Sequence, residues 1–188
     1  MCGIIGIYWK NTNESPERIC SSHSVCEEML ESLHFRGPDE RNVVRSGSAL
    51  LGHTRLSIID LETGTQPIFN ENSTIAVVLN GEIYNYLDLR LELEKKGHTF
   101  RTKTDTEVIV HLYEEVGEDV FSRLNGMFAI IIYDKVTNTI LGARDRTGEK
   151  PFLYSELPEL FVFSSEIKAI LKLPDISRDL MPKELHFI

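Results

Sequence analysis

Cys2 is the residue with the clearest chemical potential in this 188-residue chain. Cysteine is small enough for routine removal of an initiator Met1, which would leave a thiol and a free α-amine on one residue. An α-amine has a reference pKa of about 7.7–8.0, so part of it is neutral near pH 7. The amine can accept the thiol proton, directly or through one water, and so activate the nucleophile. A lone cysteine is more often inert core filler, so the residues around Cys2 decide between the two interpretations.

Two polar motifs lie at the ends of segments that we expect to be strands, and each has an ordinary and a functional interpretation. Arg55 lies in the run Gly52 to Leu61, ahead of Gln66-Pro67. It is either a surface charge at a strand end or a carboxylate clamp, because a guanidinium grips a carboxylate through two parallel hydrogen bonds. Asn80-Gly81 is either a tight turn or a pair of N–H donors placed around an oxyanion.

Asp105 adds a third group, which either caps a helix or faces an ammonium group. Taken together, these residues match the chemistry of one small molecule. Glutamine carries an α-carboxylate, an α-ammonium group and a side-chain amide. Arg55 would meet the carboxylate, Asp105 the ammonium group, and Cys2 with Asn80-Gly81 the amide.

Short apolar segments rich in β-branched and aromatic residues predict the strands that hold these groups. The expected strands are Cys2–Trp9, Ala49–Ser57, Ile75–Leu79, Phe128–Tyr133, Thr139–Ala143, Phe152–Tyr154 and Phe161–Phe163. Lys135 to Asn138 would close a hairpin between Phe128–Tyr133 and Thr139–Ala143. Arg36-Gly37-Pro38-Asp39 has the composition of a turn.

Apolar residues at helical spacing predict helices between these strands. One runs through Ile19 to Leu33, and a short one covers Ile167–Leu171. Leu87–Leu93 alternates like a strand, but its Leu, Glu and Arg composition favours a helix that ends before Gly97. Thr104 to Glu107 resembles a capping box for a helix that continues to Val116. Strands and helices alternate in groups, which indicates stacked layers of sheet and helix.

Composition and charge limit the partners. The chain has 41% apolar and 26% charged residues, which is typical of a globular domain with its own core. Its formal net charge of −9 and the lack of a basic cluster argue against nucleic acid and anionic membranes as partners. The apolar runs are too short to span a bilayer, and no secretory signal is apparent. We therefore expect a cytoplasmic protein.

The cysteine and histidine patterns predict neither disulfides nor metal. Cys20 and Cys26 would lie about 9 Å apart along one helix, which is too far for a bridge. Both are expected to be small apolar filler. The six His are scattered, and no Cys/His group has zinc spacing, so no metal ligands are expected.

The order of the motifs resembles one family, the class II (N-terminal nucleophile) glutamine amidotransferases. The similarity is greatest to the N-terminal half of glutamine-hydrolysing asparagine synthetases. The matching segments cover nearly the whole chain: Cys2 to Gly6, Arg36 to Asp39, Gly52 to Leu61, Gln66-Pro67, Asn80 to Asn85, Thr104 to Glu107, Leu124 to Ala129, Ala143 to Arg146, Gly148 to Pro151, and Ser165 to Lys168.

The resemblance implies a fold, a chemistry and a set of site residues. The family fold is α+β, a four-layer αββα sandwich of two antiparallel sheets flanked by helices. The family chemistry is attack by the N-terminal Cys on the glutamine amide, a γ-glutamyl thioester, ammonia release and hydrolysis to glutamate. Residues that match the family's catalytic positions are Cys2, Asn80 and Gly81. Those that match its glutamine-binding positions are Arg55, Leu56, Ser57, Ile58, Ile59, Asn80, Gly81, Glu82 and Asp105.

The resemblance also implies a domain organisation. Residues 1–175 would form the glutaminase domain, and residues 176–188 would begin a linker toward a synthetase domain that this chain lacks. No Ser-Gly-Gly pyrophosphate loop is present, so ATP and Mg²⁺ are expected only in that absent domain. The expected partners are L-glutamine, a C-terminal synthetase domain or partner subunit, and a second copy in a homodimer.

Departures from the family pattern occur at Lys150 to Tyr154 and at Phe163 to Glu166, and they affect the expected ammonia exit or domain contact.

Three alternatives to an asparagine-forming glutaminase stay open. The chain is a catalytically silent module, it hydrolyses a different amide, or it delivers ammonia to another acceptor such as a sugar. The complete set of Cys2, Arg55, Asn80, Gly81 and Asp105 argues against the first, and the Arg55 and Asp105 pair favours an amino-acid ligand over the second.

Overall fold

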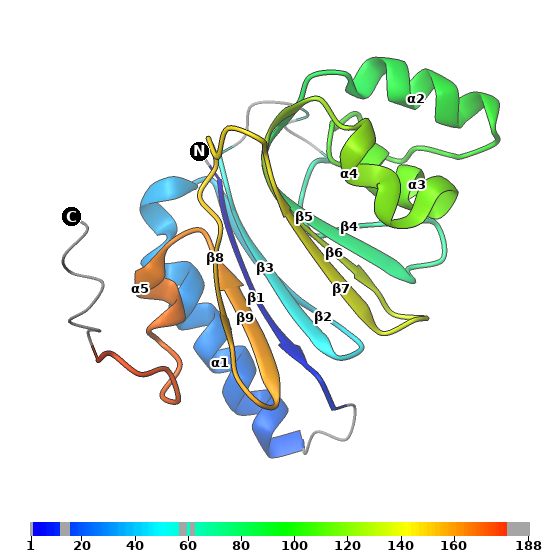
Figure 1. The fold of residues 1–188 in the computed structure, drawn as a ribbon. Coiled ribbons are helices and arrows are strands. Elements are labelled where there is room, and N and C mark those ends of the chain that lie inside the picture. The colour runs from blue at the N-terminus through cyan, green and yellow to red at the C-terminus, as the bar shows by residue number, and fades with distance from the viewer. Residues whose placement is uncertain (1, 12–15, 57–59, 61–62, 180–188) are drawn as a thin grey trace.

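Two antiparallel sheets form the centre of the molecule in this computed structural model, which describes residues 2–11, 16–56, 60 and 63–179. The first sheet has the order β2-β3-β1-β9-β8 and the second has the order β4-β5-β6-β7 (Figure 1). The strands of the first sheet are β1 (Gly3–Trp9), β2 (Glu40–Ser46), β3 (Ala49–Arg55), β8 (Leu153–Glu156) and β9 (Leu160–Ser164). Those of the second are β4 (Ile68–Phe69), β5 (Ile75–Ile83), β6 (Gly126–Asp134) and β7 (Thr139–Arg144).

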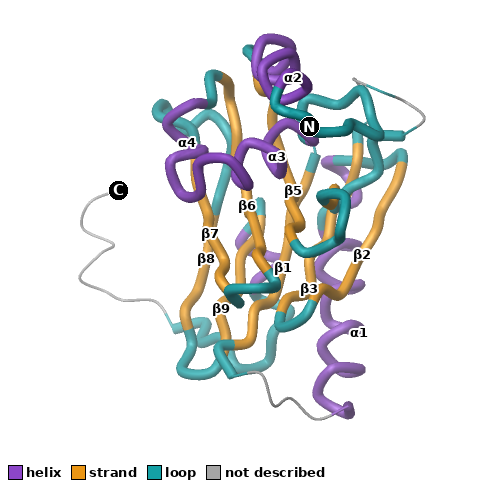
Figure 2. Tube along the Cα trace, turned by 90° about the vertical axis from the view of Figure 1, so that its right-hand side faces the viewer, coloured by secondary structure: helices purple, strands orange, loops and turns teal. Residues whose placement is uncertain are grey.

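Helices cover the outer face of each sheet, so that the sheets pack against each other in the middle (Figures 1 and 2). The first sheet is covered by α1 (Pro16–Ser32) and α5 (Ile167–Ile170), with the 3₁₀ turn η1 (His34–Arg36) after α1. The second is covered by α2 (Tyr86–Lys95), α3 (Glu107–Val116), η2 (Gly117–Asp119) and α4 (Val120–Arg123). The predicted four-layer αββα sandwich is confirmed.

Three apolar clusters correspond to the three interfaces between these layers. One joins α1 and α5 to the first sheet and contains Trp9 and Met29. Another joins α2, α3 and α4 to the second sheet. The third lies between the sheets, where Ile4, Val78 and Phe163 meet. Strand β3 is buried along its whole length because α1 covers one face and the other sheet covers the opposite face.

Close packing at the centre of β1 explains one of its glycines. A Cβ atom on Gly6 would lie 2.3 Å from the Phe163 ring and 2.8 Å from the Leu50 carbonyl oxygen. Only glycine fits there, so the aromatic ring of β9 fills the space that a side chain on β1 would need.

Most predicted elements are confirmed, and the differences have physical reasons. Strand β2 was not predicted because its partly exposed edge position carries polar residues, and β4 has only two residues. Strand β5 was expected to end at Leu79 but continues through Asn80-Gly81 to Ile83, so Asn80-Gly81 is not a turn. The interpretation of Leu87–Leu93 as a helix is correct.

The expected capping box at the start of α3 forms only in part. The Glu107 N–H donates to Thr104 Oγ1 at 3.3 Å, as a capping box requires. The Glu107 carboxylate instead accepts the N–H groups of Arg101 and Thr102, at 2.8 and 2.7 Å. The Glu107 carboxylate therefore ties the loop before α3 to the helix.

None of the described helices is long and apolar enough to cross a membrane.

Candidate active site

A cavity of about 180 Å³ lies where β1, β3 and β5 meet the segment before α3. It is lined by Cys2, His53, Arg55, Leu56, Gly64, Gln66, Leu79, Asn80, Gly81, Glu82, Thr104, Asp105, Thr106, Met127 and Lys150. Both sheets contribute to it, so the predicted residues, which lie up to 103 positions apart, are brought together by the sandwich.

Two hydrogen bonds hold the backbone at the start of β1. The Cys2 carbonyl oxygen accepts a hydrogen bond of 3.0 Å from Nε of the buried Arg36. The guanidinium of Arg36 also pairs with Glu166, at 2.5 Å. Just along the chain, the Ile4 N–H donates to Ser165 Oγ at 3.0 Å. These contacts fix the start of β1 and explain why the Arg36 and Ser165-Glu166 motifs accompany Cys2.

The Cys2 thiol faces the backbone of Leu56. The Leu56 N–H lies 3.5 Å from Sγ, and Sγ lies 3.7 Å from the Leu56 carbonyl oxygen. Burial raises the pKa of the thiol above its ordinary value, although the Leu56 N–H and the charge of Arg55 oppose that rise. A resting thiol therefore dominates near neutral pH, and nucleophilic attack requires a base that removes its proton.

Asn80 presents a buried hydrogen-bond donor to the cavity. The residue is 1% exposed, and its Nδ2 has no hydrogen-bond partner among the described residues. An unsatisfied buried amide costs about 1–3 kcal/mol, so a donor left in this state beside a cavity indicates a ligand oxygen. Next to it, a Cβ atom on Gly81 would lie 2.1 Å from the Met127 carbonyl oxygen, which restricts that position to glycine.

Asp105 is a buried carboxylate with spare acceptor capacity. Its Oδ2 accepts the Ile83 N–H at 2.8 Å, and the residue is 6% exposed. Burial raises the pKa of Asp105 above its ordinary value, while the Ile83 N–H lowers it and the Glu82 charge raises it further. A cationic ligand would lower that pKa and stabilise the ionised form. The Asp105 carboxylate accepts an N–H from β5, and the N-cap position of α3 is Thr106, so Asp105 is not the N-cap of α3.

Arg55 is buried at the end of β3, and the surrounding chain holds its guanidinium. Nη1 pairs with Glu40 at 3.4 Å, and Nη2 donates to the Asp60 carbonyl oxygen. A guanidinium has five N–H donors, so these contacts orient the group beside the cavity. The surface-charge interpretation of Arg55 is wrong, because the residue is only 6% exposed.

Of the remaining predicted residues, Leu56 and Glu82 line the cavity. Ser57, Ile58 and Ile59 lie outside the described residues. Sequence reasoning missed Gln66, whose amide bonds both backbone groups of Leu79 in β5, at 2.6 and 3.2 Å. The Gln66-Pro67 motif was the available signal, and its role is to align β5 and so position Asn80.

His53 was also missed as a cavity residue, although it lies in the Gly52 to Leu61 motif. Burial lowers the pKa of His53 to about 3, an effect that the Arg55 charge reinforces and a backbone hydrogen bond with Leu79 opposes. The imidazole is therefore neutral. Thr104, Thr106, Met127 and Lys150 also line the cavity. Each lies in a motif of the family resemblance, but no local pattern gave it a role in the site, because that role depends on tertiary contacts.

The comparison with protein families agrees with this geometry. Residues 1–188 match the sequence profile described as "Glutamine amidotransferase domain". The chain belongs to the glutamine amidotransferase domain family.

Two relatives show the relationship of this glutamine amidotransferase domain to longer proteins. "Asparagine synthetase [glutamine-hydrolyzing] 3" of Bacillus subtilis (strain 168) is 42% identical over 178 residues, which is 94% of this chain and 28% of the relative. "Probable asparagine synthetase [glutamine-hydrolyzing]" of Dictyostelium discoideum is 41% identical over 172 residues, which is 90% of this chain and 30% of the relative. The chain thus spans less than a third of these relatives.

Solved structures share the same N-terminal-nucleophile fold. The glutamine phosphoribosylpyrophosphate amidotransferase of B. subtilis, complexed with ADP and GMP, superposes with a TM-score of 0.69 at 25% identity. The match covers 90% of this chain and 43% of that one. A second structure, described as an allosteric regulatory enzyme of purine biosynthesis, superposes with a TM-score of 0.70 at 24% identity, over 91% of this chain and 43% of that one. The similarity confirms the sandwich as this glutamine amidotransferase fold.

Proposed function

We propose that this chain hydrolyses the side-chain amide of L-glutamine to glutamate and ammonia, with Cys2 as the nucleophile. The observation that carries the proposal is the unpartnered Nδ2 of Asn80 in the cavity that also contains the Cys2 thiol. A buried donor next to a nucleophile is what stabilisation of a tetrahedral oxyanion requires.

Three groups would bind the substrate. Arg55 would hold the α-carboxylate, and Asp105 would accept hydrogen bonds from the α-ammonium group. Leu56 and Glu82, which line the cavity, would lie around the aliphatic part, and Ser57, Ile58 and Ile59 stay predicted binding residues. Bound in this way, the glutamine amide carbon would face Cys2 Sγ, and the amide oxygen would face Asn80 and Gly81.

The reaction would proceed in two halves. Sγ attacks the amide carbon as the base takes the thiol proton, and the carbonyl oxygen becomes an oxyanion that Asn80 Nδ2 and the Gly81 N–H stabilise. The C–N bond then breaks, the nitrogen takes that proton, and ammonia leaves a γ-glutamyl thioester on Cys2. A water then attacks the thioester carbon, the C–S bond breaks, and the proton from water restores the thiol.

The α-amine of Cys2 is the base in this proposal, so it requires removal of Met1. A retained Met1 converts that amine into an amide, which cannot accept a proton. It would also place an extra residue beside the cavity. Protein that carries Met1 is therefore expected to be inactive, and turnover by it at the rate of processed protein would contradict the α-amine mechanism.

The ammonia acceptor is proposed from the relatives, whose names describe glutamine-hydrolysing asparagine synthetases. We propose that the ammonia serves an asparagine-synthetase-type domain or partner subunit, that ATP and Mg²⁺ bind in that part only, and that the protein acts in the cytoplasm. A sugar acceptor and a homodimer stay predictions, as does the boundary between a 1–175 domain and a 176–188 linker.

The test is glutamate release from L-glutamine by protein whose mass confirms loss of Met1, compared with Cys2→Ala. We expect turnover in the first sample, none in the second, and glutamine binding by calorimetry in both. Binding without turnover in the processed protein would indicate that the site needs its acceptor part. Absence of both binding and turnover would identify a silent module of the same fold and overturn the proposal.

A further inference from the structure

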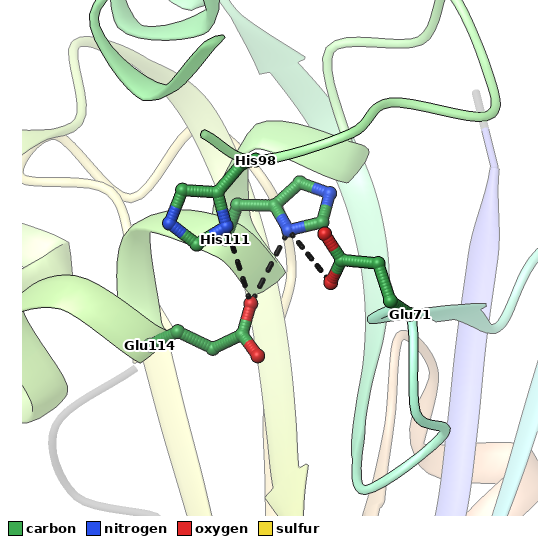
Figure 3. Close-up of side chains that lie close together, drawn as sticks. All are labelled: Glu71, His98, His111 and Glu114. Atoms are coloured by element: carbon green, nitrogen blue, oxygen red, sulfur yellow. Dashed lines mark hydrogen bonds and ion pairs between the residues drawn. The ribbon is translucent and has the colours of Figure 1, made fainter. Parts of the chain in front are cut away.

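A group of four potential metal ligands lies on the outer side of the second sheet, apart from the residues that line the cavity. Glu71 lies in the turn between β4 and β5, and His98 lies in the loop after α2. His111 and Glu114 lie one helical turn apart on α3. One ligand atom from each residue lies within 4.8 Å of the others, and Figure 3 shows the four side chains converging on one point.

Three of the six distances between these atoms are close to those of a small tetrahedral site. Nδ1 of His111 lies 3.2 Å from Oε2 of Glu114 and 3.5 Å from Oε2 of Glu71. Nδ1 of His98 lies 3.6 Å from the same oxygen of Glu114. Zinc bonds of 2.0–2.2 Å to His and carboxylate ligands place tetrahedral ligands about 3.3–3.5 Å apart. These three distances are therefore already near those of a zinc-bound set.

Each carboxylate of the group is oriented by a second partner. The other oxygen of Glu114 accepts a hydrogen bond from the buried Asn70 amide, at 2.8 Å. The other oxygen of Glu71 accepts the Thr99 N–H, at 3.2 Å. Ligating carboxylates in metal sites are typically held in this way.

The two histidines of the group are also oriented by neighbouring carboxylates. Nε2 of His98 lies 3.0 Å from the Glu115 carboxylate. Nε2 of His111 is buried, has no hydrogen-bond partner among the described residues, and faces the Glu107 carboxylate at 3.7 Å. A metal-binding His usually directs its remote nitrogen to a carboxylate, so both rings are oriented with Nδ1 toward the shared point.

Charge also favours a cation at this point. Four carboxylates (Glu71, Glu107, Glu114 and Glu115) surround the two imidazoles, and the ammonium group of Lys96 pairs with Glu115 at 2.8 Å. This concentration of negative charge favours a metal ion at Nδ1 of His111.

We propose that Glu71, His98, His111 and Glu114 form a structural site for one divalent transition-metal ion, with Zn²⁺ as the fitting ion. Four protein ligands leave no open coordination position, which is typical of a structural rather than a catalytic zinc site. The ion would join α3 to the β4–β5 turn and to the loop after α2. The sequence predicted no metal site because these residues are spaced by 27, 13 and 3 positions, which match no zinc motif.

The test uses the chain after removal of metal by a chelator, with ZnCl₂ added in a calorimeter. We expect one Zn²⁺ per chain. We also expect a rise of about 5–10 °C in the unfolding midpoint at a hundredfold excess over Kd. Co²⁺ in place of Zn²⁺ should give the visible absorption of a tetrahedral ion. No binding at one ion per chain would overturn the proposal, and so would a Co²⁺ spectrum of octahedral type.

Glu71→Gln and Glu114→Gln are the informative variants, because a glutamine oxygen can still accept from Thr99 or Asn70. Each should lower the zinc affinity by at least tenfold while circular dichroism stays unchanged. His23→Ala is the matched control, since His23 is exposed on α1 and its loss should leave binding intact. Equal affinity in the two Gln variants and the parent would refute the assignment. None of these measurements uses glutamine, so their outcome is independent of the proposed hydrolysis.

Discussion

Asp105 and Asp145 have the same exposed fraction, 6% each, yet their surroundings shift their pKa values in opposite directions. Asp145 follows β7, and burial would raise its pKa. Four backbone N–H groups and the Thr147 hydroxyl outweigh burial and hold the pKa well below its ordinary range. Asp105 accepts the Ile83 N–H, and its pKa is raised by burial.

The difference separates a structural carboxylate from one that is available to a ligand. Asp145 has both oxygens occupied by Phe128, Thr147, Glu149 and Lys150, so it closes the turn that follows β7. Asp105 lines the cavity beside Cys2 and keeps acceptor capacity. Both residues lie in motifs that the family resemblance covers, so their hydrogen bonds and the position of Asp105 beside the cavity, rather than solvent exposure or motif membership, distinguish their roles.

Among the residues that face the cavity, substitution of Asn80 should have the largest effect on activity. Asn80→Ala removes the unpartnered Nδ2 donor, and loss of one oxyanion donor costs about 10²–10³ in kcat. We expect that loss with little change in KM or in the unfolding midpoint, measured by steady-state glutamate release and thermal unfolding. A KM effect alone would show that Asn80 contacts the bound substrate and not the transition state.

Asp145→Asn should instead act on stability. The new amide group would face N–H donors, and buried donors that lose a partner cost about 1–3 kcal/mol each. We expect a loss of about 3 kcal/mol in the free energy of unfolding, measured by urea denaturation, with kcat/KM of the folded fraction within about threefold of the parent. A change below about 0.5 kcal/mol would show that the hydrogen bonds of Asp145 do not hold the turn.

Asp105→Asn is the matched substitution, at a residue with the same exposed fraction. The amide oxygen can still accept the Ile83 N–H, so the free energy of unfolding should change by less than about 1 kcal/mol. Loss of the charge that faces an ammonium group should lower kcat/KM for glutamine by about 10- to 100-fold, since hydrogen bonds to charged groups contribute about 1.5–3 kcal/mol. If Asp105→Asn destabilised the chain as much as Asp145→Asn, the distinction between the two residues would fail.

The helices and strands were predicted well because the sequence patterns that mark them are local. Apolar runs and helix-ending glycines, such as Gly97 and Gly117 with positive φ, mark elements whatever the tertiary context. The candidate site depended on a resemblance in motif order, and most of its predicted members line one cavity.

Residues whose role comes from a distant partner were not predictable. Asn80-Gly81 has the composition of a turn, but pairing with β6 keeps it in a strand. Gln66 acts through Leu79, and the four residues of the proposed zinc site meet only in the folded chain. In each case the contact joins segments that no local pattern relates.

The smallest expected effect is the pH dependence of stability, where the two aspartates should act with opposite sign. The lowered pKa of Asp145 contributes stability that is present above the unfolded pKa of about 3.9 and is lost as the pH falls through the folded value. The raised pKa of Asp105 contributes stability that is present below about 3.9 and is lost as the pH rises through its folded value. A tenfold change in the acid dissociation constant between the unfolded and folded states corresponds to about 1.4 kcal/mol.

Urea denaturation of the parent and of both Asn variants at pH 7 and pH 3 separates these contributions. Between pH 7 and pH 3 the stability gap between the parent and Asp145→Asn should shrink by about 1 kcal/mol or more. Over the same interval the parent should gain stability relative to Asp105→Asn. The other carboxylates are common to all three proteins and cancel in the differences. If the stability difference from the parent changed in the same direction for both variants, burial, and not the number of hydrogen bonds, would determine the pKa values of the two carboxylates.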